Sequence, residues 1–377
     1  MNDGVKYYRG GAIFDGNALK TDMAAVVENG LLTAIGNNLP APKGADIVDL
    51  DGDILAPGFV DLQANGGDGI MLNDDPSLAT LKRMAEAHRR LGATSVLPTL
   101  ITDTPERTRA AIEAAKAAVA AGVTGIAGLH LEGPHLSVAR KGAHDAKLIR
   151  RMTAEDLAVL IDAAGTLPVL MVTVAPESTT TDQVSALANA GAIVSLGHSD
   201  ADFDTCVAYA EAGARVVTHL FNAMSQLANR EPGLVGAALV SGNLSAGLIA
   251  DGIHVHPAAM RTAWAAKVAP GRIFLVSDAM APAGSDLCEF MLGDRMVRRA
   301  DGRLVLEDGT LAGADLELGA AIRVLVEKVG IPLEDALRAA TSTPAEVAGL
   351  GNGIGFLRPG VTRDIVRIGK DFRVTTL

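Results

Sequence analysis

Eight short apolar runs alternate with helix-like segments between Pro57 and Val276, and this alternation constrains the fold more than any other feature. The runs have the length and composition of buried strands: Phe59–Leu62, Thr94–Leu97, Ile126–Leu131, Val169–Val174, Ile193–Leu196, Val216–Thr218, Ser245–Ala250 and Ile273–Val276. Alanine-rich helical segments lie between most of them. A doubly wound open sheet would also alternate in this way. Eight units within roughly 220 residues favour a (β/α)8 TIM-like barrel instead.

The segments on either side of this region are β-like. Residues 1–55 hold short runs separated by turns, including an Asn29-Gly30 hairpin signal. The tail alternates around 364–374, so we expect it to return and complete a small N-terminal β module. We therefore predict a β-sandwich domain from residues 1–55 plus 356–377, and a barrel domain from 56–355. Residues 290–306 are predicted to form a hairpin with turns at 293–294 and 301–302.

Charge and composition exclude several classes of function. The formal net charge is -11, which disfavours nucleic acid and anionic membranes as partners because both need a concentrated basic face. No apolar run is long enough to span a bilayer, and the first residues lack the pattern of a signal peptide. There are two cysteines, without CxxC spacing, which suits a reducing compartment. We expect a cytoplasmic protein.

Three residues at predicted strand ends form a candidate metal site. Glu132 lies in the segment His-Leu-Glu-Gly-Pro-His, His198 follows Gly197, and His219 directly follows its run. Barrel enzymes keep their active sites at the C-terminal ends of the strands. One carboxylate and two imidazoles would bind a divalent ion and leave room for water, as catalytic sites require. The alternatives are a loop salt bridge for the glutamate and structural strand-end histidines.

Other polar residues could complete such a site. Asp278 follows the last run and could take a proton from a metal-bound water, or it could cap the following loop. His144 and His254 could orient a substrate or polarise a carbonyl, and Arg230 could clamp an anion or lie on the surface. His88 lies within a helical segment, where we expect a solvated face.

Taken together, nine stretches resemble the N-acetylglucosamine-6-phosphate deacetylase family of the amidohydrolase superfamily. They run in order along nearly the whole chain: residues 57–66, 130–135, 141–145, 197–199, 218–224, 230–233, 251–255, 277–279 and 310–313. The resemblance implies a distorted (β/α)8 barrel with a β-sandwich built from both termini, usually in a homodimer. It also implies hydrolysis of N-acetylglucosamine 6-phosphate to glucosamine 6-phosphate and acetate, in amino-sugar catabolism and cell-wall sugar recycling.

The resemblance further implies a role for particular residues. It has Glu132, His198 and His219 hold one divalent metal ion per subunit, zinc or iron, and it makes Asp278 the acid/base. His144 would contact the substrate and stabilise the oxyanion. It places eight residues at the phosphorylated N-acetylated sugar: Ala143, Asn222, Ala223, Arg230, His254, Leu311, Ala312 and Gly313. Arg230 would reach the phosphate from the neighbouring subunit.

One departure from the superfamily bears on the number of metals. Most amidohydrolases carry His-x-His at the end of the first strand, where this chain has Gln63-Ala64-Asn65. Amide side chains are weak zinc ligands, so we expect one metal and interpret Gln63 and Asn65 as a vestigial second-metal position. The open alternatives are an N-acetylgalactosamine-6-phosphate deacetylase, another single-metal amidohydrolase, a two-metal enzyme cleaving cyclic amides or N-acyl amino acids, and a catalytically silent barrel.

Overall fold

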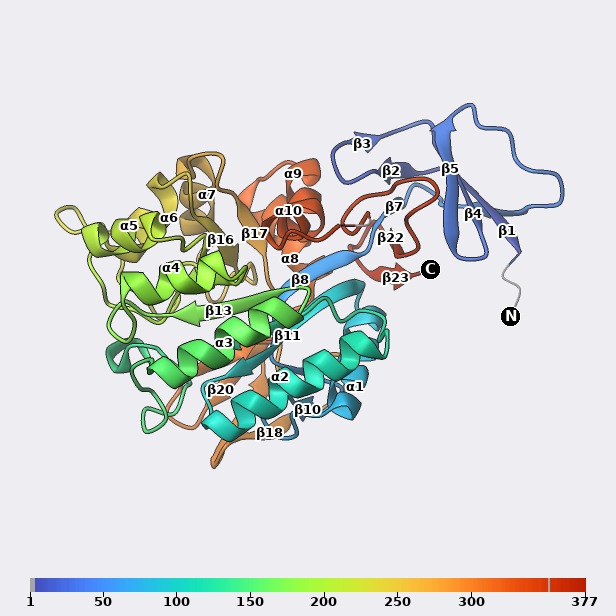
Figure 1. The fold of residues 1–377 in the computed structure, drawn as a ribbon. Coiled ribbons are helices and arrows are strands. Elements are labelled where there is room, and N and C mark those ends of the chain that lie inside the picture. The colour runs from blue at the N-terminus through green and yellow to red at the C-terminus, as the bar shows by residue number, and fades with distance from the viewer. Residues whose placement is uncertain (1–3, 352) are drawn as a thin grey trace.

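Eight parallel strands form the centre of the molecule in a computed structural model that describes residues 4–351 and 353–377 (Figure 1). Each strand pairs with the next in chain order, which confirms the predicted barrel. The strands are β8 (Phe59–Ala64), β11 (Ala93–Ile101), β12 (Leu129–Glu132), β13 (Leu170–Val174), β14 (Ile193–Leu196), β15 (Val216–Val217), β16 (Ser245–Leu248) and β17 (Ile273–Leu275).

The barrel closes between its first and last strands. Beyond the end of β17, the Asp278 N–H donates to the Gln63 carbonyl at 3.0 Å, and the Asn65 N–H donates to the Ala279 carbonyl at 2.7 Å. Ala64 and Ala279 also form a parallel bridge. The residues just after β8 and β17 are therefore held side by side at one end of the barrel.

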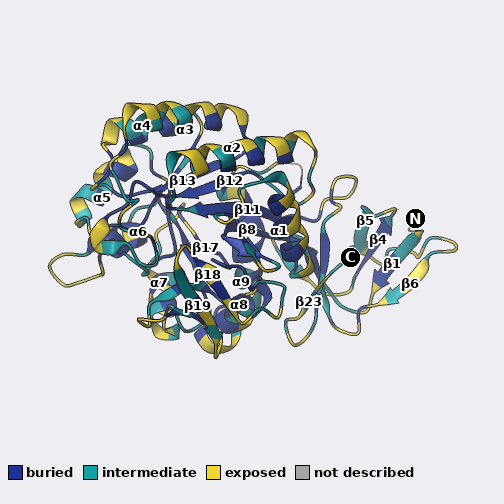
Figure 2. Cartoon of the chain, turned by 90° about the horizontal axis from the view of Figure 1, so that it is seen from below, coloured by how far each residue is buried: buried dark blue, intermediate teal, exposed yellow. Residues whose placement is uncertain are grey.

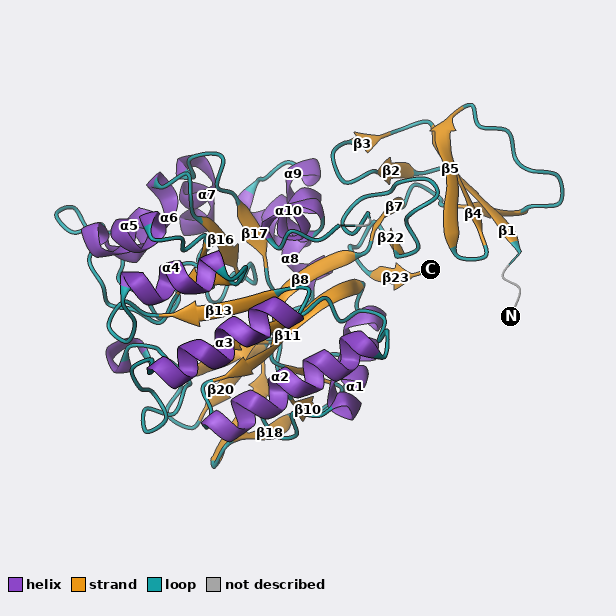
Figure 3. Cartoon of the chain, in the orientation of Figure 1, coloured by secondary structure: helices purple, strands orange, loops and turns teal. Residues whose placement is uncertain are grey.

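Helices cover the outside of the barrel and turn their buried faces toward it (Figures 2 and 3). Hydroxyl or carboxylate N-caps begin five of them, which satisfies backbone N–H groups that have no partner inside the helix. The helices are α1 (Leu78–Arg90), α2 (Pro105–Ala120), α3 (Ala154–Thr166), α4 (Thr181–Asn189), α5 (Phe203–Glu211), α6 (Gly233–Val240), α7 (Pro257–Ala266), α8 (Leu318–Val324), α9 (Leu333–Ala340) and α10 (Ser342–Val347).

The expected position of His88 on a solvated face of α1 is wrong. His88 is 2% exposed, and its Nε2 lies 2.8 Å from the carbonyl oxygen of Gly66. The helix has an amphipathic pattern in which His88 shares the inner face with Leu81 and Met84. A polar ring can occupy such a face because its nitrogen finds a backbone partner there.

Segments from both ends of the chain make the small β domain. One sheet has the order β5-β4-β1-β6, and the other has the order β23-β22-β7-β2-β3. The tail strand β22 (Ile365–Ile368) pairs with β7 (Ile54–Pro57), which confirms that the C-terminus returns to the N-terminal module. The remaining strands are β1 (Val5–Arg9), β2 (Ala12–Phe14), β3 (Leu19–Lys20), β4 (Met23–Glu28), β5 (Leu31–Asn37), β6 (Asp46–Asp49) and β23 (Val374–Thr376).

A second small sheet lies beside the barrel, at the opposite end from the β domain. The hairpin predicted over 290–306 is present but belongs to four antiparallel strands: β18 (Glu289–Leu292), β19 (Arg295–Ala300), β20 (Arg303–Leu306) and β21 (Leu311–Ala314). It has an apolar core of its own that includes Met280, Phe290 and Val297. The Ala314 N–H donates to the Asp278 carbonyl at 2.9 Å, which fastens this sheet to the end of the barrel. Among the described residues, no helix is long and apolar enough to cross a membrane.

Candidate active site

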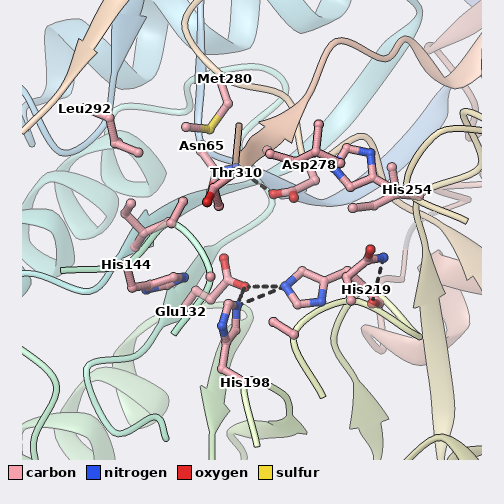
Figure 4. Close-up of a pocket in the computed structure, with 18 residues that line it drawn as sticks. Asn65, Glu132, His144, His198, His219, His254, Asp278, Met280, Leu292 and Thr310 are labelled. Carbon is pink, nitrogen blue, oxygen red and sulfur yellow. Dashed lines mark hydrogen bonds and ion pairs between the residues drawn. The ribbon is translucent and has the colours of Figure 1, made fainter. Parts of the chain in front are cut away.

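A cavity of about 250 Å³ opens at the C-terminal ends of the barrel strands (Figure 4). The β18–β21 sheet contributes part of its wall through Leu292 and the segment 310–313. Of the residues predicted for the site, twelve line this cavity: Asn65, Glu132, Ala143, His144, His198, His219, Asn222, Ala223, His254, Asp278, Leu311 and Gly313. Residues from eight of the nine stretches that carry the resemblance therefore meet in one place.

Glu132, His198 and His219 form a buried cluster that could hold a metal ion. The Nε2 atoms of the two histidines lie 3.0 Å apart, and each is 3.1 Å from Oε1 of Glu132. Ligands bonded to one zinc ion in tetrahedral geometry stand roughly 3.3 Å from one another. Nδ1 of His198 lies 2.8 Å from the Arg140 carbonyl, so a proton there would leave Nε2 free to bind a cation.

The electrostatics of the cluster also suit a cation. Burial would raise the pKa of Glu132, but hydrogen bonds with His198 and His219 outweigh it and hold that pKa well below its usual range. Burial would lower the pKa of His219, but the hydrogen bond and charge of Glu132 raise it overall. The carboxylate is thus ionised at neutral pH and favours positive charge between the two rings. A divalent ion would supply this positive charge, so these residues fit a metal.

The backbone at the cluster is held in an uncommon conformation. His198, His219 and Asp278 have positive φ angles of 47°, 29° and 50°. Non-glycine residues adopt this left-handed region uncommonly, Asp and His more often than most, and such conformations concentrate at functional sites. Each of these residues lies two or three positions beyond the end of its strand, β14, β15 or β17, in the turn at the mouth of the barrel.

Asp278 lies beside the cluster and is contacted by two amides. Gln63 Nε2 donates to Oδ1 of Asp278 and to Oε2 of Glu132, at 3.1 Å each, and Asn65 Nδ2 donates to Oδ1 of Asp278 at 2.7 Å. Burial and the nearby Glu132 carboxylate raise the pKa of Asp278 to about 6. The two amides thus lie where the superfamily pattern would have metal-binding histidines, and here they bind carboxylates instead.

The hydrogen bonds of His144 define its tautomer. The Thr102 N–H points at Nδ1 of His144 at 3.3 Å, and Thr102 Oγ1 lies 2.7 Å from the same nitrogen. Burial holds the pKa of His144 well below its usual value, so the ring is neutral. Because Nδ1 accepts from a backbone donor, the proton is on Nε2. His144 can therefore donate a hydrogen bond into the cavity.

His254 is held by a carboxylate that the sequence did not single out. Nδ1 of His254 lies 2.6 Å from Oδ2 of Asp251, while Oδ1 of Asp251 accepts the N–H groups of Ile253 and His254 at 2.8 Å each. Nδ1 therefore donates to Asp251, and Nε2 is left for the cavity. In Figure 4 the ring of His254 lies beside Asp278.

Three of the predicted residues do not line the cavity. Gln63 lies behind it and bonds to Glu132 and Asp278. Ala312 is fully buried in the core of the β18–β21 sheet. Arg230 is exposed on the loop before α6 and is not among the described residues that line the cavity of its own chain.

Six further cavity residues were given no role in the sequence analysis, although Gly142 and Thr310 belong to stretches that carry the resemblance. They are Ile101, Gly142, Ile249, Met280, Leu292 and Thr310. Their only shared signal is proximity in sequence to a strand end or to a predicted site residue. For Asp251, the signal is an Asp three residues before a loop His, the spacing that places the carboxylate against both the loop N–H groups and the ring.

A parallel barrel with a carboxylate–histidine cluster and Asp278 at its C-terminal strand ends has the architecture of a barrel enzyme whose site can hold a metal ion. The sequence pattern of the amidohydrolase family matches residues 54–377. The chain belongs to the amidohydrolase family.

Relatives and solved structures are similar over nearly the whole chain. An N-acetylgalactosamine-6-phosphate deacetylase of Shewanella sp. is 42% identical over 93% of this chain and 89% of its own length. An N-acetylglucosamine-6-phosphate deacetylase of Haemophilus influenzae is 33% identical over 94% of this chain and 92% of its own. The crystal structure of N-acetylglucosamine-6-phosphate deacetylase from Pasteurella multocida is 34% identical, with a TM-score of 0.92 over 98% of this chain and 97% of that one. The resemblance noted in the sequence is confirmed.

Proposed function

We propose that this protein hydrolyses the N-acetyl group of N-acetylglucosamine 6-phosphate, giving glucosamine 6-phosphate and acetate. One observation carries the proposal: Glu132, His198 and His219 converge beside Asp278 in one cavity, in a chain closely related to enzymes named for this reaction. Burying four ionisable groups together destabilises the fold, and a catalytically silent barrel would gain nothing from them in return. The sites and roles below are part of the same proposal.

Glu132, His198 and His219 would hold one divalent metal ion, zinc or iron. When bound, such an ion lowers the pKa of a coordinated water to about 7 and polarises a carbonyl oxygen. Asp278 takes the proton of the attacking water, since its Oδ1 is held by Asn65 and its second oxygen makes none of these bonds. His144 donates its Nε2 proton in a hydrogen bond to the oxygen that becomes negative. Asp278 then passes its proton to the departing amino group.

The substrate is a phosphorylated amino sugar in this proposal. A mutant N-acetyl-D-glucosamine-6-phosphate deacetylase from Mycobacterium smegmatis, solved in complex with N-acetyl-D-glucosamine-6-phosphate, is 31% identical to this chain with a TM-score of 0.90. The galacto epimer is a second candidate, because the 42% identical Shewanella relative is named for it. Asn222, Ala223, Leu311 and Gly313 line the cavity and would contact the sugar phosphate.

An acetate-release assay tests the proposal. We expect zinc-loaded protein to cleave N-acetylglucosamine 6-phosphate at least tenfold faster, by kcat/KM, than unphosphorylated N-acetylglucosamine. The galacto 6-phosphate measured beside it ranks the two epimers. Equal rates on phosphorylated and unphosphorylated sugars would contradict phosphate recognition. No acetate from any of the three would contradict the deacetylase itself.

Three further statements stay predictions. The domain boundaries at 55/56 and 355/356 are one, and the cytoplasmic location is another. The third is a homodimer in which Arg230 reaches the phosphate in the neighbouring subunit. The exposed position of Arg230, outside the cavity of its own chain, supports it.

A further inference from the structure

A continuous chain of hydrogen bonds crosses the barrel interior directly beneath the metal cluster. Thr99 Oγ1 lies 3.3 Å from Nδ1 of His130, and Nε2 of His130 lies 2.8 Å from Thr173 Oγ1. Thr173 Oγ1 is 2.7 Å from Thr218 Oγ1, which is 2.6 Å from Ser195 Oγ. All five side chains are at most 3% exposed. We call them the polar chain.

The polar chain can satisfy every hydrogen it carries. Ala64 N–H donates to Thr99 Oγ1, and the Thr99 hydroxyl can donate to the Leu97 carbonyl at 3.1 Å. The His130 ring then donates from Nδ1 to Thr99 and accepts at Nε2 from the Thr173 hydroxyl. Thr173 accepts from Thr218, which accepts from Ser195. In this arrangement each hydroxyl and the ring N–H has an acceptor, and the Leu62 backbone is a further hydrogen-bond partner of His130.

A polar layer is unusual inside such a barrel, where branched apolar side chains dominate. A buried hydroxyl adds little stability even when it is hydrogen-bonded, and it destabilises the fold when its partner is lost. Packing alone would be served as well by valine in place of each threonine. The polar layer therefore has a different role: it holds neighbouring barrel strands in a defined position rather than adding stability.

The polar chain holds together the strands that carry Glu132, His198 and His219. His130 precedes Glu132 by two residues on β12, and Thr173 is the register partner of Glu132 on β13. Thr218 immediately precedes His219. Ser195 lies on β14, whose end leads into Gly197 and His198.

The same threonines also support His198 by contact. A Cβ on Gly197 would lie 2.9 Å from Cβ of Thr218 and 3.0 Å from Cγ2 of Thr173. The backbone before His198 thus lies directly against both threonines, which the lack of a side chain at Gly197 permits. Hydrogen bonds and packing independently tie the three ligand-bearing segments to one pair of residues.

We propose that the polar chain Thr99–His130–Thr173–Thr218–Ser195 positions Glu132, His198 and His219 and thereby sets the affinity of the site for its metal ion. The members are positioning residues, since none of them lines the cavity. Metal sites tolerate errors of only about 0.2 Å in ligand distance, so a small slip between strands weakens binding. The inference rests on the proposed function only in taking these three residues as the metal ligands.

Zinc binding to the full-length protein, measured by competition with a chromophoric chelator, tests the inference. Thr218→Val keeps the shape of the side chain and removes the hydroxyl. We expect the Kd for zinc to rise at least about threefold, which is less than the roughly 10- to 100-fold seen when a direct hydrogen-bond partner of a metal ligand is removed, because the Thr218 hydroxyl bonds to Thr173 and Ser195 and not to a ligand. Thr218→Ser keeps the hydroxyl and should restore most of the affinity. Thr341→Val is the matched control, because Thr341 is equally buried but bonds to Leu337 in α9.

A merely structural role predicts a different pattern. It would lower the thermal midpoint of the metal-free protein in Thr218→Val and Thr341→Val alike, and leave the zinc Kd of both within twofold of the wild type. That result would overturn the inference. If Thr218→Val does not fold, Ser195→Ala decides, since it removes only the terminal donor; a Kd raised severalfold supports the polar chain, and an unchanged Kd overturns it. Wild-type protein that binds no zinc would instead overturn the metal site on which the proposed function also rests.

Discussion

Asp278 is the residue on which the proposed chemistry depends most directly. Asp278→Asn keeps the size of the side chain but removes the proton acceptor. We expect kcat to fall about 100- to 10,000-fold, the usual worth of a general base, while zinc content and the thermal midpoint stay near those of the wild type. Acetate release, metal analysis and thermal unfolding measure the three quantities. Asp204→Asn, on the exposed side of α5, controls for the charge change; near-full activity of Asp278→Asn would exclude the proposed role.

Asp251 gives a second prediction at the residue scale. Its Oδ1 is occupied by two backbone N–H groups, so in Asp251→Asn the new amide N–H faces Nδ1 of His254 and moves the ring proton to Nε2. We expect kcat/KM to fall at least about tenfold, because a comparable exchange in serine proteases costs far more. The double variant with His254→Asn should lose little further activity. Fully additive losses would show that the two residues act separately.

The cap of α3 gives a prediction at the scale of one element. Asp156 accepts two hydrogen bonds from Arg150 and closes a capping box with Thr153. Partial burial would raise the pKa of Asp156, but the bonds from Arg150 and Thr153 hold it far below its usual range. We expect Asp156→Asn to cost about 1–2 kcal/mol of unfolding free energy at pH 7.

The pH dependence of this loss of unfolding free energy follows from the direction in which the pKa of Asp156 is shifted. A carboxylate with a lowered pKa in the folded state stabilises the protein above its unfolded pKa, near 3.9, and loses this contribution as the pH falls toward the folded value. Urea unfolding should therefore show the difference between wild type and Asp156→Asn narrowing below about pH 5. Asp162→Asn, on the same helix but in an exposed pair with Lys116, should change little at either pH. If the difference in unfolding free energy between wild type and Asp156→Asn did not change with pH, the lowered pKa of Asp156 could not be its cause.

An element could be predicted where neighbouring residues determine it, and it was missed where residues distant in the sequence determine it. The barrel strands and the Asn29-Gly30 hairpin come from local periodicity and turn chemistry, so the sequence was sufficient for them. The β18–β21 sheet was seen only as a hairpin, because its fourth strand, Leu311–Ala314, is short and small-residue-rich. His88 was misplaced because its partner, Gly66, belongs to another part of the chain.

Site residues also divide into those that local sequence indicates and those that depend on distant contacts. Glu132, His198, His219 and Asp278 were accessible because each is a polar residue where an apolar run ends. Thr102 was not, because its role depends on meeting a ring 42 residues away. Packing and hydrogen bonds between distant segments carry the information that a single sequence leaves out.

Removal of the metal should affect the molecule as a whole. A ligand that binds only the folded state stabilises it by roughly 4 kcal/mol when its free concentration is a thousand times its Kd. We therefore expect a chelator to abolish acetate release and to lower the thermal midpoint by several degrees, and added zinc to restore both. Scanning calorimetry checks this. Glu132→Gln should show no such shift with chelator, and an equal shift there would mean that the metal binds elsewhere.

The predicted homodimer can be tested by complementation. Arg230→Ala and Asp278→Asn are each expected to be nearly inactive, for different reasons. In a mixed dimer, the subunit with Arg230→Ala keeps its own Asp278 and receives Arg230 from its partner. Co-expression of the two variants should thus restore up to one working site per mixed dimer, measured as acetate release. Failure to restore activity in purified mixed dimers would contradict donation of Arg230 across the interface.

The pairing of β22 with β7 has a consequence for how the molecule is made. The ribosome delivers β7 early, and β8 of the barrel begins only two residues later, at Phe59. One side of β7 then keeps open backbone donors and acceptors until Ile365–Ile368 has been synthesised, after the whole barrel. Every nascent or prematurely terminated chain carries this unfinished sheet edge, which is the kind of surface that recruits other chains. A ribosome that stalls anywhere in the barrel therefore releases a product prone to aggregate, however well its barrel has formed.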